Sequence, residues 1–504
     1  MNNKTRSHNV KKNSVYSAVL QITALVLSFI NRTVFVSFLS SEYLGVNGLF
    51  GNILTVLSLA ELGVGTVMIY ALYKPIADKD YDLISAYVNY FKKCYKWIGL
   101  IVLGLGLLLL PFLQFVVTGA NIPLNEIRLF YIVYLLNTVF TYIGVYKQTL
   151  LNADQNTFVV KKWNFCFTVL MHVTQILTLF LFKNYLIYIL VMMTCTLLNN
   201  IYVNLKTNKL YPFLKKEGNL SEKQKITIKE KVKATLVYKI SITLMNNTDN
   251  ILISIIVGTV FVGYYSNYSL IVGAITSLFT ILVSVCTSSV GNLNASGNKV
   301  KLYRVFRMFV FAFHWIIMFC SICFFFLLND FITLWLGTEY VLSFSILFAI
   351  VFYFYITNIV SPVYMYRESV GLFERTKYLN FAAMIINIIL SIILGYIWGM
   401  FGILIATSIA RIVTTVWKEP LILHREVFQK PSRYYFKQQL RYIIFTAIAF
   451  GATYLCMIPF ESIGVVNFII KCFICLIVPN AIFLLFNFKS RYFKDFKEYL
   501  LNRN

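Results

Sequence analysis

SVYSAVLQITALVLSFINRTVFVSFLSSEYLGVNGLFGNILTVLSLAELGVGTVMIYALY, residues 14–73, is the stretch that decides the fold. It holds two apolar runs, each at least as long as the roughly 20 residues that an α-helix needs to cross a bilayer. Polar side chains lie inside both runs: Asn31 and Arg32 in the first, Glu61 in the second. Because a charge at membrane depth is costly, such residues normally face a bundle interior or a hydrated cavity. The stretch therefore predicts a helical hairpin with polar groups that point into a protein interior.

The composition extends this interpretation to the whole chain. Of its 504 residues, 59% are hydrophobic and only 13% are charged, which is more apolar surface than a soluble protein can cover. The apolar runs are continuous rather than alternating, which favours helices over a membrane barrel. The first run is too long for the apolar core of a signal peptide and no A-x-A site follows it. We expect an all-α polytopic membrane protein with about fourteen transmembrane helices.

The net charge of +25 has an uneven distribution along the chain. Forty of the 45 Lys and Arg residues fall in segments that we place on one side of the membrane; Arg128 and Lys183 fall on the other. This is the positive-inside bias of a protein in a cytoplasmic membrane, and it puts both termini in the cytoplasm. Topology therefore accounts for the basic balance, and nucleic acid is not expected as a partner.

The polar segments between the runs divide the chain. The predicted parts are a basic cytoplasmic N-terminus (1–13), a first lobe of six helices (14–205), a basic cytoplasmic linker (206–233), a second lobe of six helices (234–424), a loop with an extra helix pair (425–488) and an amphipathic cytoplasmic tail (489–504). In the linker, Ser221 followed by Gln224 has the pattern of a capping box and predicts a helix start. The tail has the composition of a surface helix.

Sequence landmarks recur at one constant spacing, which we call the repeat spacing. The pairs that define it are Leu44–Gly45 with Val262–Gly263, Leu109–Leu110 with Leu327–Leu328, and Val145–Tyr146 with Val363–Tyr364. One spacing that serves three landmarks predicts an internal repeat of the two lobes. With an even number of helices per lobe, both lobes enter the membrane from the same side, so the repeat is parallel. The same spacing places Asn31–Arg32 opposite Asp249–Asn250.

Motifs of enzymes and of metal sites are absent from the sequence. It has no GxxxxGK[ST] loop, no HExxH and no EF-hand loop, and its predicted outer loops are too short for an active site. The pairs Cys320/Cys323 and Cys472/Cys475 have no further ligand nearby, and we interpret them as packing residues. His172 and His314 are lone residues in apolar runs and are expected to be buried and hydrogen-bonded. The chain is not expected to be an enzyme or to hold a metal or cofactor.

The charged residues within apolar runs are the candidate site. The cations are Arg32, Arg411 and Lys471, and the acids are Glu61 and Asp249, with Asn31 and Asn250 beside them. Three cations at mid-depth cost about 8–10 kcal/mol on insertion scales, so something must compensate them. One explanation is mutual ion pairing that fixes helix packing. The other is a hydrated cavity for an anionic ligand. Glu61 is equally consistent with a hinge anchor.

Two stretches resemble a known family. SEYLGVNGLFGNILTVLSLAELGVGTVMIYALYKPIA, residues 41–77, resembles the opening of bacterial polysaccharide-export flippases, which move lipid-linked O-antigen and capsule repeat units. LLNDFITLWLGTEY, residues 327–340, is similar to their ninth helix and the loop after it, in which Asp330 would be an outer-loop residue. The family belongs to the multidrug/oligosaccharidyl-lipid/polysaccharide exporter superfamily, with the multidrug and toxic compound extrusion transporters and the peptidoglycan-precursor flippase.

The resemblance implies a function. It implies two six-helix lobes, alternating access and an undecaprenyl-pyrophosphate-linked oligosaccharide as cargo, with Arg32 at the place of a helix-1 arginine in the peptidoglycan-precursor flippase. It also implies an extra helix pair that forms a lipid groove, a role open to residues 439–488. The partners would be the lipid-linked cargo, membrane lipids, a coupling ion (proton or sodium) and the polysaccharide polymerase. The alternative is a drug/cation antiporter of the multidrug and toxic compound extrusion type.

Overall fold

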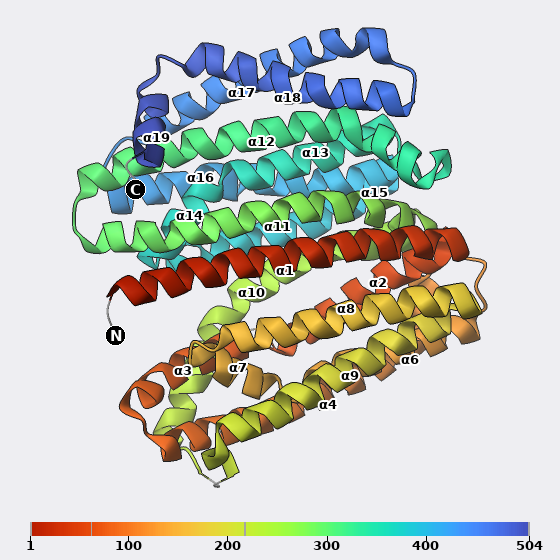
Figure 1. Cartoon of the computed structure of the whole chain (residues 1–504), viewed down its shortest axis with the longest axis vertical. Coiled ribbons are helices and arrows are strands. Elements are labelled where there is room, and N and C mark those ends of the chain that lie inside the picture. The colour runs from red at the N-terminus through yellow and green to blue at the C-terminus, as the bar shows by residue number, and fades with distance from the viewer. Residues whose placement is uncertain (1–2, 62, 216–217, 502–504) are drawn as a thin grey trace. The chain divides into compact units, whose positions relative to one another are not determined.

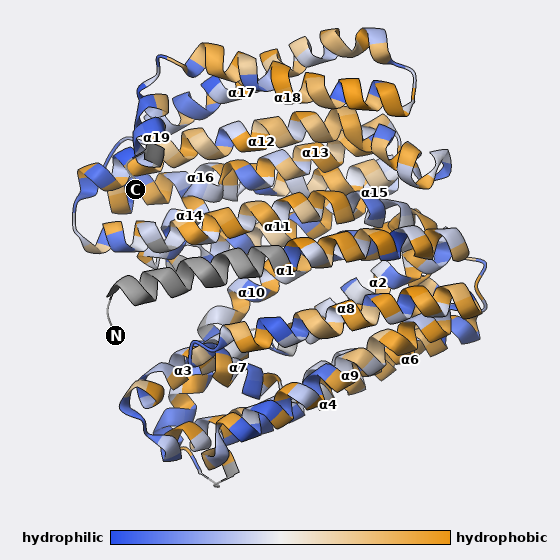
Figure 2. Ribbon diagram, in the orientation of Figure 1, coloured by the Kyte–Doolittle hydropathy of each residue, from blue (hydrophilic) through white to orange (hydrophobic). Residues whose placement is uncertain are grey.

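The protein is helical throughout its regular structure. A computed structural model describes residues 3–61, 63–215 and 218–501, and every regular element in those ranges is a helix (Figure 1). Apolar residues run along most of these helices (Figure 2). The prediction of an all-α chain is confirmed.

By its internal contacts the chain forms two compact units, Met1–Gly263 and Tyr264–Asn504. The helices of the first unit are α1 (Asn3–Phe38), α2 (Ser41–Leu57), α3 (Val64–Asp78), α4 (Tyr81–Leu109), α5 (Leu113–Val116), α6 (Leu124–Thr141), α7 (Val145–Ala153), α8 (Thr157–Phe182), α9 (Tyr185–Leu210) and α10 (Glu222–Ile256). Helix α11 (Thr259–Ala295) begins in this unit and continues into the second.

The second unit continues with α12 (Lys299–Leu336), α13 (Phe344–Ile359), α14 (Ser361–Val370), α15 (Phe373–Val413), α16 (Thr415–Leu423), α17 (Arg433–Met457), α18 (Val465–Asn487) and α19 (Arg491–Leu501). A single π-helical turn, His424–Phe428, follows α16. Helices α17 and α18 pack against each other, and α18 packs against α12.

The described helices give a multi-pass membrane protein. Ten helical segments are long and apolar enough to cross a membrane, or eleven if the bent pair α6–α7 is one span. One of these segments, Arg375–Phe428, has 54 residues. Gly399 interrupts α15 within it, with φ 59° and ψ −138°. Helix α2 has only 17 residues, and α10 begins in a Lys-rich stretch, so neither is among the ten. The count of fourteen stays a prediction.

Helix boundaries follow the repeat spacing found in the sequence. Four pairs of boundaries are separated by this same spacing: the ends of α1 and α10 at Phe38 and Ile256, the starts of α2 and α11 at Ser41 and Thr259, the starts of α4 and α12 at Tyr81 and Lys299, and the ends of α6 and α13 at Thr141 and Ile359. Even a helix cap repeats, because Asp80 and Asn298 each accept a backbone N–H three residues on, at 2.9 Å. The repeat is therefore present in the secondary structure; its parallel orientation stays a prediction.

Two glycines of the repeat allow the starts of α2 and α11 to touch. A Cβ atom on Gly45 would lie 2.0 Å from the carbonyl oxygen of Thr259, and one on Gly263 would lie 2.5 Å from that of Ser41. Ser41 and Thr259 are related by the repeat spacing, and so are Gly45 and Gly263, which makes the contact reciprocal. Backbone-to-backbone approach at this distance requires residues without side chains, as is common where membrane helices pack.

The predicted linker 206–233 contains the end of α9, the short 3-10 turn Pro212–Lys215 and the start of α10. The capping box is confirmed. The backbone N–H of Gln224 donates to Ser221 Oγ at 3.4 Å, and the backbone N–H of Ser221 donates to Gln224 Oε1 at 3.0 Å. The predicted tail helix is α19. Its Asp495 binds Arg304 of α12 at 2.5 Å, so an ion pair holds α19 against α12 within the second unit.

Candidate functional site: buried polar clusters in the two units

Asn31 lies in a polar network between α1, α8 and α9 of the first unit. Its side chain is 2% exposed. Its amide nitrogen lies 2.6 Å from His172 Nδ1 and 2.7 Å from Gln175 Oε1, and its amide oxygen accepts from the Tyr188 hydroxyl at 3.3 Å. Arg32, the next residue, is half-buried and lies near the hydroxyls of Tyr188 and Tyr134. The polar pair in the first apolar run thus faces protein, as the sequence predicted, and the expectation that His172 is hydrogen-bonded is confirmed.

Glu61 lies apart from this network, in the short 3-10 turn Ser58–Glu61 that joins α2 to α3. It lines a cavity of about 380 Å³ inside the first unit, bounded by α6, α7, α8 and α9. Amide and hydroxyl side chains make up much of the wall, among them Gln148, Asn164, Asn199 and Thr196. The amide oxygen of Asn199 has no hydrogen-bond partner among the described residues and is buried. The cavity can therefore accept hydrogen bonds or a cation.

Asp249 and Asn250 lie side by side on α10, and both are half-buried. Helix α10 packs mainly against α2, whereas α1 packs against α8. The repeat spacing places Arg32 opposite Asp249, but their helices pack mainly against other helices. A direct contact between the two residues stays a prediction.

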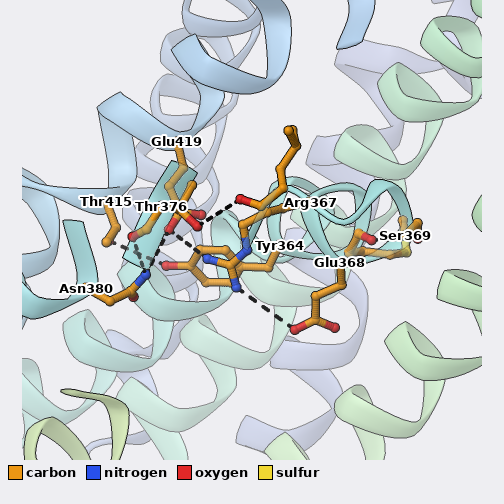
Figure 3. Close-up of polar contacts among 10 residues, drawn as sticks. Tyr364, Arg367, Glu368, Ser369, Thr376, Asn380, Thr415 and Glu419 are labelled. Atoms are coloured by element: carbon orange, nitrogen blue, oxygen red, sulfur yellow. Dashed lines mark hydrogen bonds and ion pairs between the residues drawn. The ribbon is translucent and has the colours of Figure 1, made fainter. Parts of the chain in front are cut away.

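The second unit holds a buried ion pair that sequence reasoning missed. Arg367 Nη1 of α14 lies 2.8 Å from Glu419 Oε1 of α16, with side chains 5% and 1% exposed. Asn380 of α15 donates to the same carboxylate oxygen at 3.5 Å, and the Arg367 guanidinium lies over the Tyr364 ring at 4.9 Å. Figure 3 shows these side chains converging from three helices. The other carboxylate oxygen, Glu419 Oε2, is buried and has no hydrogen-bond partner among the described residues.

The signal for this pair was present but incomplete. Arg367 and Glu419 both fall within the predicted second lobe, next to apolar runs, where charges are expected in polar segments between helices. The structure instead places them within α14 and α16, where the chain is helical and buried. Opposite charges 52 residues apart give no local pattern, so only the packing of α14 on α16 reveals the pair.

Arg411 of α15 lies close to this cluster. Its guanidinium lies 5.8 Å from the centre of the Tyr353 ring of α13, and it also contacts the hydroxyl of Tyr364. Tyr364 therefore contacts both Arg411 and Arg367, and it donates to Thr415 Oγ1 at 3.5 Å. Two arginines and three hydroxyl-bearing side chains are thus gathered in one part of the second unit.

Lys471 of the extra helix pair has a carboxylate partner. Its ammonium lies 2.6 Å from Asp330 Oδ2, with side chains 10% and 16% exposed. The placement of Asp330 in an outer loop is wrong: it lies on α12, before that helix ends at Leu336. The pair lines a cavity of about 480 Å³ with Phe325, Phe326 and Tyr454. Ion pairing of α18 to α12 therefore explains why a lysine is tolerated in this apolar helix.

Solved structures with this arrangement of helices are membrane transporters. The chain is similar to the lipid II flippase MurJ in an inward closed conformation, with a TM-score of 0.68 and 16% identity over 94% of this chain and 98% of that one. This likeness over nearly the whole of both chains shows that they share a fold.

Two structures described as MOP superfamily transporters are also similar. An inward-facing multidrug resistance MATE family transporter matches with a TM-score of 0.60 and 16% identity, over 79% of this chain and 97% of that one. A MOP superfamily transporter from Pyrococcus furiosus, described as having a binding pocket of reversed polarity, matches with a TM-score of 0.51 and 14% identity, over 84% of this chain and 97% of that one. No protein-family model matches the chain, and no curated protein matches it. These likenesses establish the fold, and the three proteins named are transporters or flippases by their descriptions.

Proposed function

We propose that the protein is a flippase that moves undecaprenyl-pyrophosphate-linked oligosaccharide repeat units from the inner to the outer leaflet of the bacterial cytoplasmic membrane, for surface polysaccharide synthesis. In this proposal both termini are cytoplasmic and transport is by alternating access. The observation that supports it most is how much of the chain each known fold covers.

The flippase structure matches 94% of this chain and the MATE structure 79%. The flippase match therefore takes in a further part of the chain, and we infer that this part is C-terminal. Helices α17 to α19 cover residues 433–501, a segment of about the size of that further part. The extra C-terminal helices are thus a feature that favours the flippase over the drug exporters.

Cations inside the units suit an anionic cargo. A diphosphate cannot cross hydrocarbon unaided, and guanidinium groups bind it with two parallel hydrogen bonds. Arg32 and Arg411 both lie among tyrosine hydroxyls, groups that can add hydrogen bonds to a phosphate. Arg367 and Lys471 form ion pairs with Glu419 and Asp330, and we assign them to helix packing. We assign the principal diphosphate contact to Arg32, and Arg411 adds positive potential.

The other candidate residues take lesser roles in this proposal. Asn31 positions Arg32, and Asp249 with Asn250 binds polar groups of the cargo from α10. Glu61 belongs to a separate cavity, and Lys471 supports the extra helix pair. With the cell interior negative, outward movement of each negative charge gains about 2.3 kcal/mol per 100 mV, so export needs no nucleotide.

Drug/cation antiport is the second candidate. The carboxylate of Glu61 in a polar cavity is the feature that favours it, because an acidic cavity suits a cationic ligand. Both candidates predict transport by the same fold, so only the cargo separates them.

The test uses purified protein in liposomes. Labelled lipid-linked oligosaccharide in the inner leaflet should become accessible to an external glycosidase with the wild type and with Lys183→Ala, which removes an exposed cation. Arg32→Ala should abolish this transfer while the protein remains folded. Uptake of cationic dyes without any transfer of the lipid-linked sugar would overturn the proposal in favour of antiport.

A further inference from the structure

His172 is the one titratable member of the polar network of α1, α8 and α9 that can change its charge near neutral pH. Its ring lies between Asn31 on one side and Ser28 on the other, both on α1. The side chain of Gln175, one turn further along α8, completes the network with Tyr188 of α9. Two backbone carbonyl oxygens, those of Ala24 and Tyr188, accept hydrogen bonds from members of this network.

The direction is set by a backbone carbonyl, which can only accept. Gln175 Nε2 donates to the carbonyl oxygen of Tyr188 at 3.2 Å, so the Gln175 oxygen faces Asn31. Asn31 must then turn its NH₂ group toward that oxygen, at 2.7 Å. The Tyr188 hydroxyl agrees with this orientation, because it donates to the Asn31 oxygen at 3.3 Å. The second hydrogen of the Asn31 amide therefore points at His172 Nδ1, 2.6 Å away, which must carry a lone pair.

The other ring nitrogen leads to the same conclusion. The Ser28 hydroxyl donates its one hydrogen to the carbonyl oxygen of Ala24 at 2.9 Å. Toward His172 Nε2, at 3.5 Å, Ser28 can therefore only accept, so Nε2 carries the hydrogen. His172 is thus held as the neutral Nε2–H tautomer from both sides, with one open protonation position at Nδ1.

We propose that His172 is a proton-binding site of the first unit, and that a proton taken up at Nδ1 releases Asn31 and displaces α1. In this step a proton from water binds the Nδ1 lone pair and Nε2 keeps its hydrogen, so the ring becomes an imidazolium. Two donors then face each other across the contact with Asn31. A half-turn rotation of the Asn31 amide would not restore the contact, because its oxygen would then face the oxygen of Gln175. The orientation of Gln175 is set by its hydrogen bond to the Tyr188 carbonyl.

A positive charge on His172 would act on the side chains around it. The charged or titratable side chains that face the network are Arg32 of α1, Tyr188 of α9 and Tyr134 of α6. Helix α7, which also packs on α8, carries Lys147, and its ammonium binds Asn208 at 2.9 Å. Arg32 borders the network through the Tyr188 hydroxyl, so a charged His172 adds a second cation beside it, in addition to the lost Asn31 contact. Both effects move α1 away from α8.

Proton binding would in this way act on the residue that we assign to the diphosphate, a step that rests on the proposed function. Asn31 and Arg32 are consecutive on one helix, so a displacement of the first moves the second. Proton and cargo then compete, and by thermodynamic linkage each lowers the affinity for the other, by about 5–150-fold where such couplings have been measured. The coupling ion of this exporter would be the proton.

The proton site is tested without cargo, in the full-length protein in lipid. The chain has four histidines, so ¹⁵N-histidine solid-state NMR gives few signals, and His172→Gln identifies the one of interest. The expected result is a neutral Nε2–H ring at pH 8 that becomes an imidazolium on acidification. A ring that stays neutral to pH 5, or that shows the Nδ1–H tautomer at pH 8, overturns the inference.

Movement of α1 is tested by amide hydrogen exchange over residues 20–38. His172→Gln offers Asn31 an acceptor oxygen but cannot be charged, so it serves as the locked variant at the same pH. The wild type should exchange at least about fivefold faster than this variant at pH 5.5 and equally at pH 8. Equal exchange in wild type and His172→Gln at both values overturns the inference.

The link to transport is tested in liposomes with an imposed pH difference. Export by the wild type should respond to the pH difference and export by His172→Gln should not. An identical response in both proteins overturns the inference. Absence of any lipid-linked sugar export from both, with the NMR and exchange results as expected, would refute the proposed function and leave the proton site standing.

Discussion

The ion pair of Arg367 and Glu419 gives the sharpest prediction for stability. Its charged atoms lie 2.8 Å apart and both side chains are almost fully buried, so solvent screens the pair little. At an effective dielectric constant of about 20, two unit charges at this distance attract by roughly 6 kcal/mol. Much of this offsets the cost of desolvating both ions, yet removal of one partner leaves a buried charge and costs about 3–5 kcal/mol.

The two single variants should not be equal. In Arg367→Met the remaining carboxyl can bind a proton and become neutral, whereas in Glu419→Leu the remaining guanidinium stays charged at any accessible pH. We therefore expect Glu419→Leu to lose about 3–5 kcal/mol of unfolding free energy and Arg367→Met to lose less. The loss in Arg367→Met should shrink further as the pH falls from 8 to 5, because the carboxyl is neutralised without cost.

The double variant Arg367→Met/Glu419→Leu is the decisive member of the cycle. With no charge left, it should be more stable than Glu419→Leu and close to the wild type. Reversible denaturant unfolding in mixed micelles, followed by helical circular dichroism, measures all four proteins. If the double variant were as unstable as the sum of the two single variants, the residues would not act as a pair and the reasoning would be refuted.

Three further predictions follow from the positions of particular residues. In a cysteine-free background, an impermeant thiol reagent added outside intact cells should label Asn121→Cys and not Asn219→Cys. Both positions are exposed on the protein surface, so labelling depends only on the side of the membrane. Labelling of Asn219→Cys would contradict the predicted topology. Gly45→Ala should lower the melting temperature by several degrees, because its Cβ would lie 2.0 Å from a carbonyl oxygen. Gly51→Ala, whose Cβ would have no atom within 4 Å, should leave the melting temperature unchanged. Equal melting temperatures of the two variants would show that α2 can shift to accept the added methyl group. Arg32→Lys should retain part of the export activity measured as surface polysaccharide, since it keeps the charge and loses the two-pronged hydrogen bond; full activity would assign Arg32 a structural role.

Much of the candidate site could be anticipated because burial in a membrane is visible in the sequence. Asn31 and Arg32 stand out against an apolar run, and the structure gives them polar partners on α8 and α9. Glu61 stood out in the same way and lies in a polar cavity. Their mutual arrangement was not visible, since Glu61 belongs to a different pocket and the partners of Asn31 are 141–157 residues away.

The sequence by itself determined the helices, the repeat and the polar surroundings of Asn31, Arg32 and Glu61. Apolar runs, caps such as Ser221 and a constant repeat spacing are local or periodic properties, and a bilayer requires that such runs become helices with every backbone group satisfied. Only the tertiary structure decided which charges are neutralised. Glu419 neutralises Arg367, and Asp330 neutralises Lys471, because packed helices bring together residues 52 and 141 positions apart. The tautomer of His172 was decided in the same way, since it depends on a backbone carbonyl of α9 that no local pattern connects to α1 and α8.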